Sequence, residues 1–191
     1  MIRQCVGAVV LATLCGCMTP VTVGADKVGT ATQKATGAAD LLFQRLSGEL
    51  ATAMANGGPA SAVRICKERA PAIAAEIEAA SGVDIERTAL RVRNPANAPD
   101  KWEKATMLSF ISRRAAGEEW AGMIATRIED RQLLWMRPIP LGGMCSACHG
   151  DPATFTPDTL RALSDAYPID EATGFVIGEL RGAFSARVQI R

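Results

Sequence analysis

The stretch "RQLLWMRPIPLGGMCSACHGDP", residues 131–152, joins a short apolar run to two cysteines and a histidine. Residues 131–141 are apolar and bounded by prolines, which is typical of a short β-strand. Two glycines then lead into Cys-Ser-Ala-Cys-His, which contains the only histidine of the 191-residue chain. We therefore expect a strand that ends just before the cysteine motif.

Two helices are predicted before this strand, because apolar residues recur there every three or four positions. The first covers residues 38–55 and ends at "NGGP". The second covers residues 59–80, where Pro71 is expected to kink the helix or split it in two. Cys66 falls on the apolar stripe of this second helix, so we expect its side chain to face the interior.

The rest of the chain mixes strands with helices. Residues 83–93 alternate as a strand does, and a capping-box pattern at Asp100 predicts a helix over residues 101–116. After the cysteine motif, residues 156–167 are predicted as a short helix, and residues 174–190 as two short strands or one long strand. Helices first, followed by strands mixed with helices, favour an α+β fold with an antiparallel sheet.

The first residues, "MIRQCVGAVVLATLCGCMTP", have the layout of a secretory signal, with one early base, an apolar run and small residues. The apolar run is too short to span a bilayer. "LCGC" has the form of a bacterial lipoprotein box, which predicts lipidation of Cys17, while cleavage after Ala25 is the alternative and gives a soluble product. We therefore expect a signal peptide over residues 1–16, a linker over 17–36 and one domain over 37–191, located in the periplasm.

Charge and cysteine content narrow the classes of function. Without residues 1–16 the chain carries as many acidic as basic side chains, so a nucleic-acid partner is not expected. Three of the six cysteines belong to the signal region, leaving Cys66, Cys145 and Cys148. Because three is an odd number, a complete disulfide framework is excluded.

Cys145, Cys148 and His149 form a C-x-x-C-H run, which is the attachment motif of c-type haem. Two thiols at this spacing can reach the two vinyl groups of one haem, and the next residue then presents an imidazole to the iron. A zinc site that adds Cys66 to these three residues has an acceptable ligand set, but adjacent ligands are geometrically awkward. A thiol-redox C-x-x-C would need a βαβ context that is missing here. The motif therefore favours one covalently bound haem c.

His149 can occupy only one face of a haem iron, and no second histidine exists for the other face. The soft ligands that remain are Cys66 and four methionines, because Met1 and Met18 lie at the amino-terminal end and Met144 adjoins the motif. Those methionines are Met54, Met107, Met123 and Met136. Residue type alone does not decide between the cysteine and the methionines.

Several blocks of the chain, in this order, resemble a known family. The blocks are "ICKERAPAIA" (65–74), "RTALRVRNPANAPDKWE" (87–103), "RPI" (137–139), "CSACHG" (145–150) and "ATGFVIGELRGAFS" (172–185). Together they resemble the monohaem c-type cytochromes of PAS-like fold first described from a cyanobacterium, over nearly all of the chain from about Leu41. The resemblance implies a PAS-like antiparallel sheet with N-terminal helices packed around one covalently bound haem.

The resemblance also implies the second axial ligand. In that family an axial cysteine comes from the helix with a C-x-x-x-A-P block, here "CKERAP", so Cys66 is implied opposite His149. Ala89 stands where the family pattern has a hydroxyl residue, which removes one local hydrogen bond. Three arginines are candidates for pairing with the haem propionates, with a solvated strand face as the alternative: Arg87, Arg91 and Arg93.

Ligation by histidine and cysteine would favour ferric iron and a low reduction potential. With both axial positions filled and no second histidine to act as acid or base, enzymatic activity is not expected. We therefore expect a periplasmic low-potential electron carrier that has a redox partner protein and a lipid anchor in the membrane. The alternative is a redox or diatomic-gas sensor that passes a signal to a separate partner, and a Cys3His zinc domain is a remote third.

Overall fold

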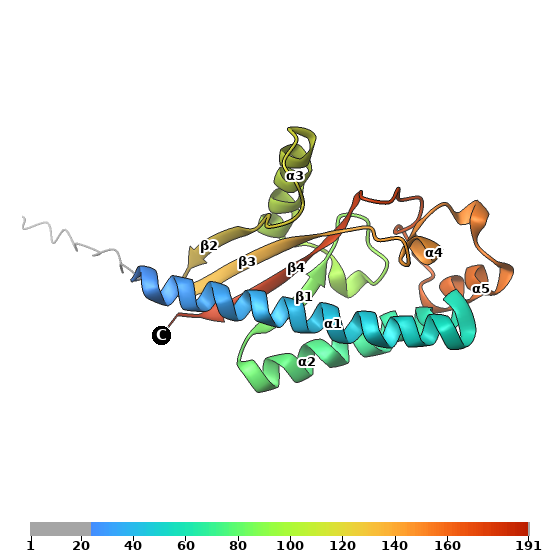
Figure 1. Cartoon of the computed structure of the whole chain (residues 1–191), viewed down its shortest axis with the longest axis horizontal. Helices are drawn as coiled ribbons and strands as arrows, with labels where there is room; N and C mark the ends of the chain where they lie inside the picture. Colours follow the sequence, from blue (N-terminus) through green and yellow to red (C-terminus); the bar gives the residue numbers. More distant parts are fainter. Residues whose placement is uncertain (1–23, 191) are drawn as a thin grey trace, which may run out of the picture.

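The computed structural model describes residues 24–190, and its centre is a four-stranded antiparallel sheet (Figure 1). The strands lie in the order β1–β4–β3–β2. Their bounds are β1 (Asp84–Thr88), β2 (Ala125–Glu129), β3 (Gln132–Pro140) and β4 (Leu180–Gln189). Every neighbouring pair is antiparallel, and β3–β4 is the longest pairing.

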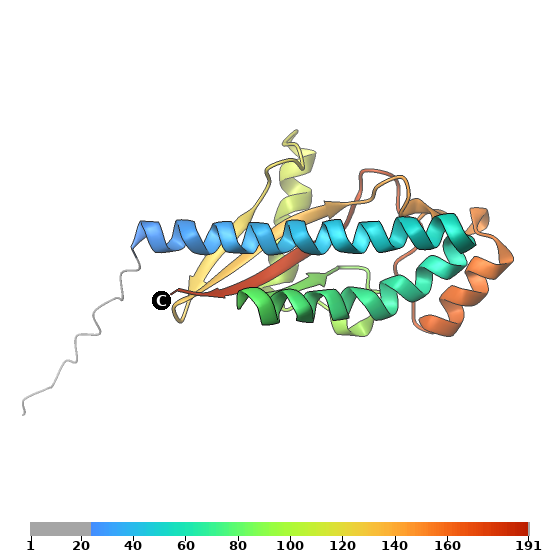
Figure 2. The ribbon, with the colours of Figure 1, turned by 60° about the horizontal axis from the view of Figure 1, so that its bottom comes forward.

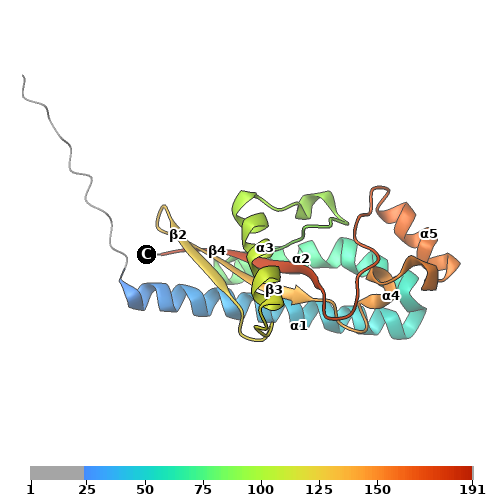
Figure 3. The same cartoon turned by 90° about the horizontal axis from the view of Figure 1, so that it is seen from above.

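Helices cover both faces of this sheet (Figures 2 and 3). α1 (Ala25–Arg64) and α2 (Ala70–Ser81) pack on one face, and α3 (Lys101–Ala115) packs on the other. The cysteine motif begins at Cys145 and continues through α4 (Ser146–His149). It lies near α5 (Pro157–Ala166), at the end of the molecule remote from the carboxyl terminus (Figure 1). Three short segments complete the fold: a π-helix, η1 (Ile65–Arg69), and two 3-10 turns, η2 (Pro95–Asn97) and η3 (Pro152–Thr154). The predicted α+β fold with an antiparallel sheet and N-terminal helices is confirmed.

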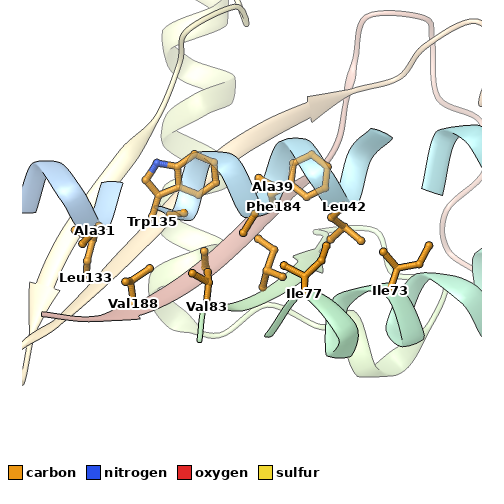
Figure 4. Close-up of a cluster of buried hydrophobic side chains, with 14 of the residues drawn as sticks. Ala31, Ala39, Leu42, Ile73, Ile77, Val83, Leu133, Trp135, Phe184 and Val188 are labelled. Carbon is orange, nitrogen blue, oxygen red and sulfur yellow. The ribbon is translucent and has the colours of Figure 1, made fainter. Parts of the chain in front are cut away.

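The main core lies between the sheet and the pair α1 and α2 (Figure 4). Leu42 of α1, Ile73 and Ile77 of α2, Trp135 of β3 and Phe184 of β4 are each at most 4% exposed. Burying a side chain of this size stabilises the fold by about 1.5–3 kcal/mol. This core therefore fixes the position of the helical segment that carries Cys66 relative to the sheet.

The chain reverses direction at the predicted "NGGP" break. Gly57 and Gly58 leave the helical conformation, and Gly58 has φ of 66°, which favours glycine. The helix resumes at Pro59 and runs back along the first part of α1 (Figure 2). The disturbance predicted at Pro71 is present as the π-helix η1, since a proline cannot donate the backbone hydrogen bond of a regular α-helix.

The predicted linker over residues 17–36 is wrong from residue 25 onward, because α1 already begins at Ala25. Ala31 and Ala35 of this segment are buried in the main core. Alanine contributes little to a hydrophobic pattern, so the buried face of this helical segment resembles a small-residue linker in the sequence.

The strand predictions are confirmed in part. β3 ends just before the cysteine motif, and residues 174–190 contain one long strand, β4. β1 stops at Thr88, short of the predicted Arg93, because the chain leaves the sheet where the amide of Ala89 donates to the carbonyl of Asn97 at 3.2 Å. β2 was not predicted, since most of its residues are exposed and show no alternation of burial.

The capping box that starts α3 is confirmed. The Asp100 carboxylate accepts a hydrogen bond from the Glu103 amide at 2.7 Å, and the Asp100 amide donates to the Glu103 carboxylate at 3.0 Å. These two bonds satisfy backbone donors at the start of the helix.

Among residues 24–190, none of the helices has both the length and the apolar composition needed to cross a membrane. The predicted signal peptide and Cys17 lie outside the described residues.

Candidate cofactor cavity

The cysteine motif is held in a short, closely hydrogen-bonded turn after β3. The amide of Cys145 donates to the carbonyl of Gly142 at 3.1 Å, and the hydroxyl of Ser146 donates to the carbonyl of Gly143 at 2.6 Å. At the end of α4, a Cβ on Gly150 would lie 2.6 Å from the Ser146 carbonyl oxygen. Only glycine therefore fits this close approach without a shift of the backbone.

Residues 174 and 175, which precede β4, hold the end of the cysteine motif by two backbone hydrogen bonds. Amides of Gly174 and Phe175 donate to the carbonyls of Gly150 and His149, at 2.6 and 3.0 Å. Through these bonds, residues that lie about 25 positions apart in the sequence hold His149 in place.

One cavity brings the predicted site residues together. Cys66, Cys145, Cys148 and His149 all line it, and part of it is open to solvent. Most of the remaining wall is apolar, with Phe43, Leu46, Leu50, Val63, Ile139 and Phe184 among the lining residues. The helix that carries Cys66 and the turn that carries the motif therefore face a shared space.

The three thiols occupy different parts of this wall. Cys66 stands in the first turn of η1 and is half-buried. Cys145 packs near Leu141 and Phe175, and the thiol of Cys148 lies 3.9 Å from the carbonyl oxygen of Pro59. Two separate parts of the chain, η1 and the turn that carries α4, therefore contribute the sulfur atoms.

The motif thiols are neutral near pH 7. Burial raises the pKa of Cys145, with a smaller contribution from Cys66. Burial also raises the pKa of Cys148 to about 11, although the charge of Arg93 opposes this shift. Within the part of the chain that the structure describes, no three acidic, cysteine or histidine side chains converge to hold a metal ion. This geometry weighs against the zinc alternative.

The hydrogen bonds of His149 select one tautomer of the imidazole. Nδ1 lies 2.7 Å from the carbonyl oxygen of Ala172, which can only accept, so Nδ1 carries the hydrogen. Burial, followed by the charges of Arg181 and Arg93, holds the pKa of His149 well below its usual value, so the ring is neutral. Nε2 therefore carries no hydrogen, so its lone pair can bind a metal in place of the long contact with Nη1 of Arg93 at 3.5 Å.

Two arginines stand beside this ring. Nη1 of Arg93 lies 3.5 Å from Nε2 of His149, and Nε of Arg181 lies 3.1 Å from Nδ1. Because Nδ1 already carries a hydrogen, the second contact is the approach of a cation to the ring and not a hydrogen bond. Burial lowers the pKa of Arg181 to about 10, with the charges of Arg93 and Arg87 acting in the same direction.

The three arginines singled out in the sequence have different surroundings. Arg87 and Arg93 line the cavity, but Arg93 is buried and ion-paired with Asp170 at 2.9 Å. Arg91 is not among the lining residues, because its guanidinium stacks over the Phe175 ring, 4.0 Å from the ring centroid. Arg181 lines the cavity, and sequence reasoning did not single it out.

The structure also separates the candidate methionines. Met107, Met123 and Met136 are buried with α3 on the opposite face of the sheet from α1. Met54 lines the cavity together with Cys66. Among the five residues considered as a second ligand, only Cys66 and Met54 therefore face the motif.

Ala89, where the family pattern has a hydroxyl residue, is buried in the cavity wall. The hydroxyl of the preceding residue, Thr88, donates to the Asn97 carbonyl at 3.4 Å. A hydroxyl group therefore still contacts this loop, from the neighbouring position.

The fold and the site together define a class of protein: an α+β domain in which a helical hairpin packs on an antiparallel sheet and a C-x-x-C-H motif faces a third cysteine across a cavity. The chain belongs to the Tll0287-like family, whose model matches residues 25–189. The predicted family resemblance is thereby confirmed.

A solved structure shows the same fold. The crystal structure of the cyanobacterial haem protein Tll0287 superposes with a TM-score of 0.65 and 24% sequence identity, covering 87% of this chain and 96% of that chain. The chain matches no curated protein.

Proposed function

We propose that this chain is an exported c-type cytochrome with one haem. Cys145 and Cys148 hold the haem through thioether bonds, and His149 and Cys66 bind its iron on opposite faces. The observation that carries this proposal is that these four side chains, from η1 and from the turn after β3, line one cavity.

The residues around the cavity fit this cofactor. The cavity has a largely apolar wall, which suits the hydrophobic faces of a porphyrin. Cys145 and Cys148 are free cysteines, each able to form one thioether bond, and Nε2 of His149 carries no hydrogen and can bind a metal. When bound, the haem supplies a one-electron couple between ferric and ferrous iron.

Cys66 is the proposed second ligand because three of the four candidate methionines lie on the other side of the sheet. Between Cys66 and Met54, the family resemblance favours the cysteine. A thiolate donates electron density strongly and compensates positive charge on iron, so it stabilises the ferric state. The proposed role is therefore low-potential electron transfer to or from a redox partner protein, with no catalytic activity of its own.

A second candidate function rests on the π-helix. Cys66 lies in η1, and π-helical turns are rare and frequent at functional sites. If Cys66 leaves the iron on reduction, the protein would act as a redox or diatomic-gas sensor, with the movement of η1 as its signal to a separate partner.

The proposed location is the periplasm, with a lipid anchor at Cys17. Residues 18–24 separate this cysteine from the start of α1. At no more than about 3.6 Å per residue, such a tether reaches roughly 25 Å, so it would hold the domain near the membrane surface.

Intact mass of the full chain, matured in a host that attaches c-type haem, tests this function. We expect the mass of one haem to be added and to remain after denaturation. A chain purified without haem, and with stoichiometric zinc, would overturn the proposal in favour of the zinc alternative.

A further inference from the structure

Two arginines of the cavity carry charges that the described residues do not neutralise. Arg87 and Arg181 both line the cavity, and within residues 24–190 neither forms an ion pair. By contrast, Arg93 is paired with Asp170 at 2.9 Å. Arg87 also makes no side-chain hydrogen bond to any described residue, while Arg181 donates only to the carbonyl of Arg91, at 3.3 Å, beside its approach to the His149 ring.

The sheet brings these two arginines to the same end of the cavity. Arg87 of β1 lies opposite Phe184 of β4, and Arg181 precedes Phe184 by three positions on that strand. Between them, the two strands approach closely, because a Cβ on Gly182 would lie 2.5 Å from the Thr88 carbonyl oxygen. Arg181 itself stands at an irregularity of the β3–β4 pairing, where Ile139 pairs with Gly182 and Pro140 with Leu180.

The cavity wall consequently has an excess of positive charge. Three guanidinium groups, those of Arg87, Arg93 and Arg181, face one carboxylate partner, Asp170. Asp170 pairs with Arg93, so the charges of Arg87 and Arg181 remain without a partner among the described residues. Unpaired charge in an apolar, partly buried space is unfavourable, and it favours a ligand with matching negative charge.

We propose that Arg87 and Arg181 bind the two propionate carboxylates of the haem. This inference rests on the proposed function. A thiolate from Cys66 cancels the net charge of a ferric haem centre, which leaves two propionates to match two guanidinium groups. Guanidinium groups bind carboxylates in charge-assisted hydrogen bonds, so this end of the cavity is suited to the polar edge of the cofactor.

This arrangement links the two arginines to the reduction potential. Each guanidinium contributes positive charge near the iron and also keeps a propionate ionised. Replacing either arginine with glutamine should therefore lower the potential and shift its pH-dependent region toward higher pH, because an unpaired propionate takes up a proton more readily.

The test compares reduction potentials of the haem-loaded protein across pH for Arg87→Gln and Arg181→Gln. Arg127→Gln, which removes the same charge from an exposed position on β2, serves as the control. We expect a lower potential and a shifted pH profile in both cavity variants, recovery of much of the effect in Arg181→Lys, and no shift in the control. Because Arg87 makes no ion pair or side-chain hydrogen bond within residues 24–190, its replacement by glutamine should leave the fold intact.

Failure of the inference about the two arginines can be distinguished from failure of the proposed function. Haem-loaded Arg87→Gln and Arg181→Gln variants with the potential and pH profile of the wild type would overturn this inference alone. A wild-type chain that acquires no covalent haem would overturn the proposed function.

Discussion

Nδ1 of His149 lies 2.7 Å from the carbonyl oxygen of Ala172, so a residue near β4 determines the tautomer of the only histidine. The same carbonyl accepts a hydrogen bond from Arg93 at 3.1 Å. Arg93 in turn is ion-paired with Asp170 and donates to the carbonyl of Cys148. One buried guanidinium therefore ties the motif to residues 170–172.

Breaking this ion pair should destabilise the protein. The side chains of Arg93 and Asp170 are 7% and 13% exposed, and removing one partner leaves the other charge buried. We expect Asp170→Asn to lower the free energy of unfolding by about 3 kcal/mol, measured by urea denaturation. The matched control is Asp158→Asn, whose exposed pair with Arg161 should contribute less than about 1 kcal/mol. Equal effects of the two substitutions would contradict the role assigned to Asp170.

The close approach of β4 to β1 should not tolerate a methyl group. In Gly182→Ala the new Cβ would lie 2.5 Å from the Thr88 carbonyl oxygen, so a strand must shift. We expect a loss of about 1–3 kcal/mol in thermal or urea unfolding. Gly48→Ala, an exposed position within α1 with no atom near its Cβ, should instead stabilise by about 0.5–1 kcal/mol. Wild-type stability in Gly182→Ala would show that the strands are farther apart than described.

The two motif cysteines should each form one covalent bond. Cys145→Ser or Cys148→Ser alone should retain haem through the remaining thioether. The double variant should lose its haem on extraction with acidified acetone, with intact mass as the second readout. Haem that resists extraction from the double variant would place the covalent attachment elsewhere.

Membrane attachment should depend on Cys17. We expect Cys17→Ser to move the protein from the membrane fraction to the soluble periplasmic fraction, because acylation of this thiol supplies the anchor. Cys15→Ser, which alters the same box without removing the acylated residue, is the matched control. Continued membrane attachment of Cys17→Ser would rule out lipidation as the anchor.

Structural features that depend only on neighbouring residues could be predicted from the sequence. The capping box of Asp100 and Glu103 and the break at Gly57 and Gly58 depend on a few adjacent residues, and both are present. The C-x-x-C-H motif could likewise be recognised in the sequence, because its residues lie within five consecutive positions. By contrast, the buried helical segment around Ala31 and the exposed strand β2 carry weak hydrophobic patterns, so neither was predicted.

Features set by the packing of distant segments could not be predicted from single positions. Which face of the sheet Met107 and Met136 occupy depends on how β3 pairs with its neighbours. Arg181 likewise reaches the cavity only because β4 starts beside the motif. Arg91 was one of the three arginines that the sequence offered as candidates, but its side chain stacks on Phe175. Long-range pairing therefore decides which of several similar side chains reach the site.

The ligation by His149 and Cys66 is tested most directly by the absorption and paramagnetic resonance spectra of the ferric protein. Wild type, Cys66→Ala and Met54→Leu should be compared, each with covalent haem verified by mass. We predict that Cys66→Ala keeps its haem but loses the wild-type ferric spectrum, while Met54→Leu is unchanged. An unchanged spectrum in Cys66→Ala, together with an altered one in Met54→Leu, would place the methionine on the iron and contradict the account.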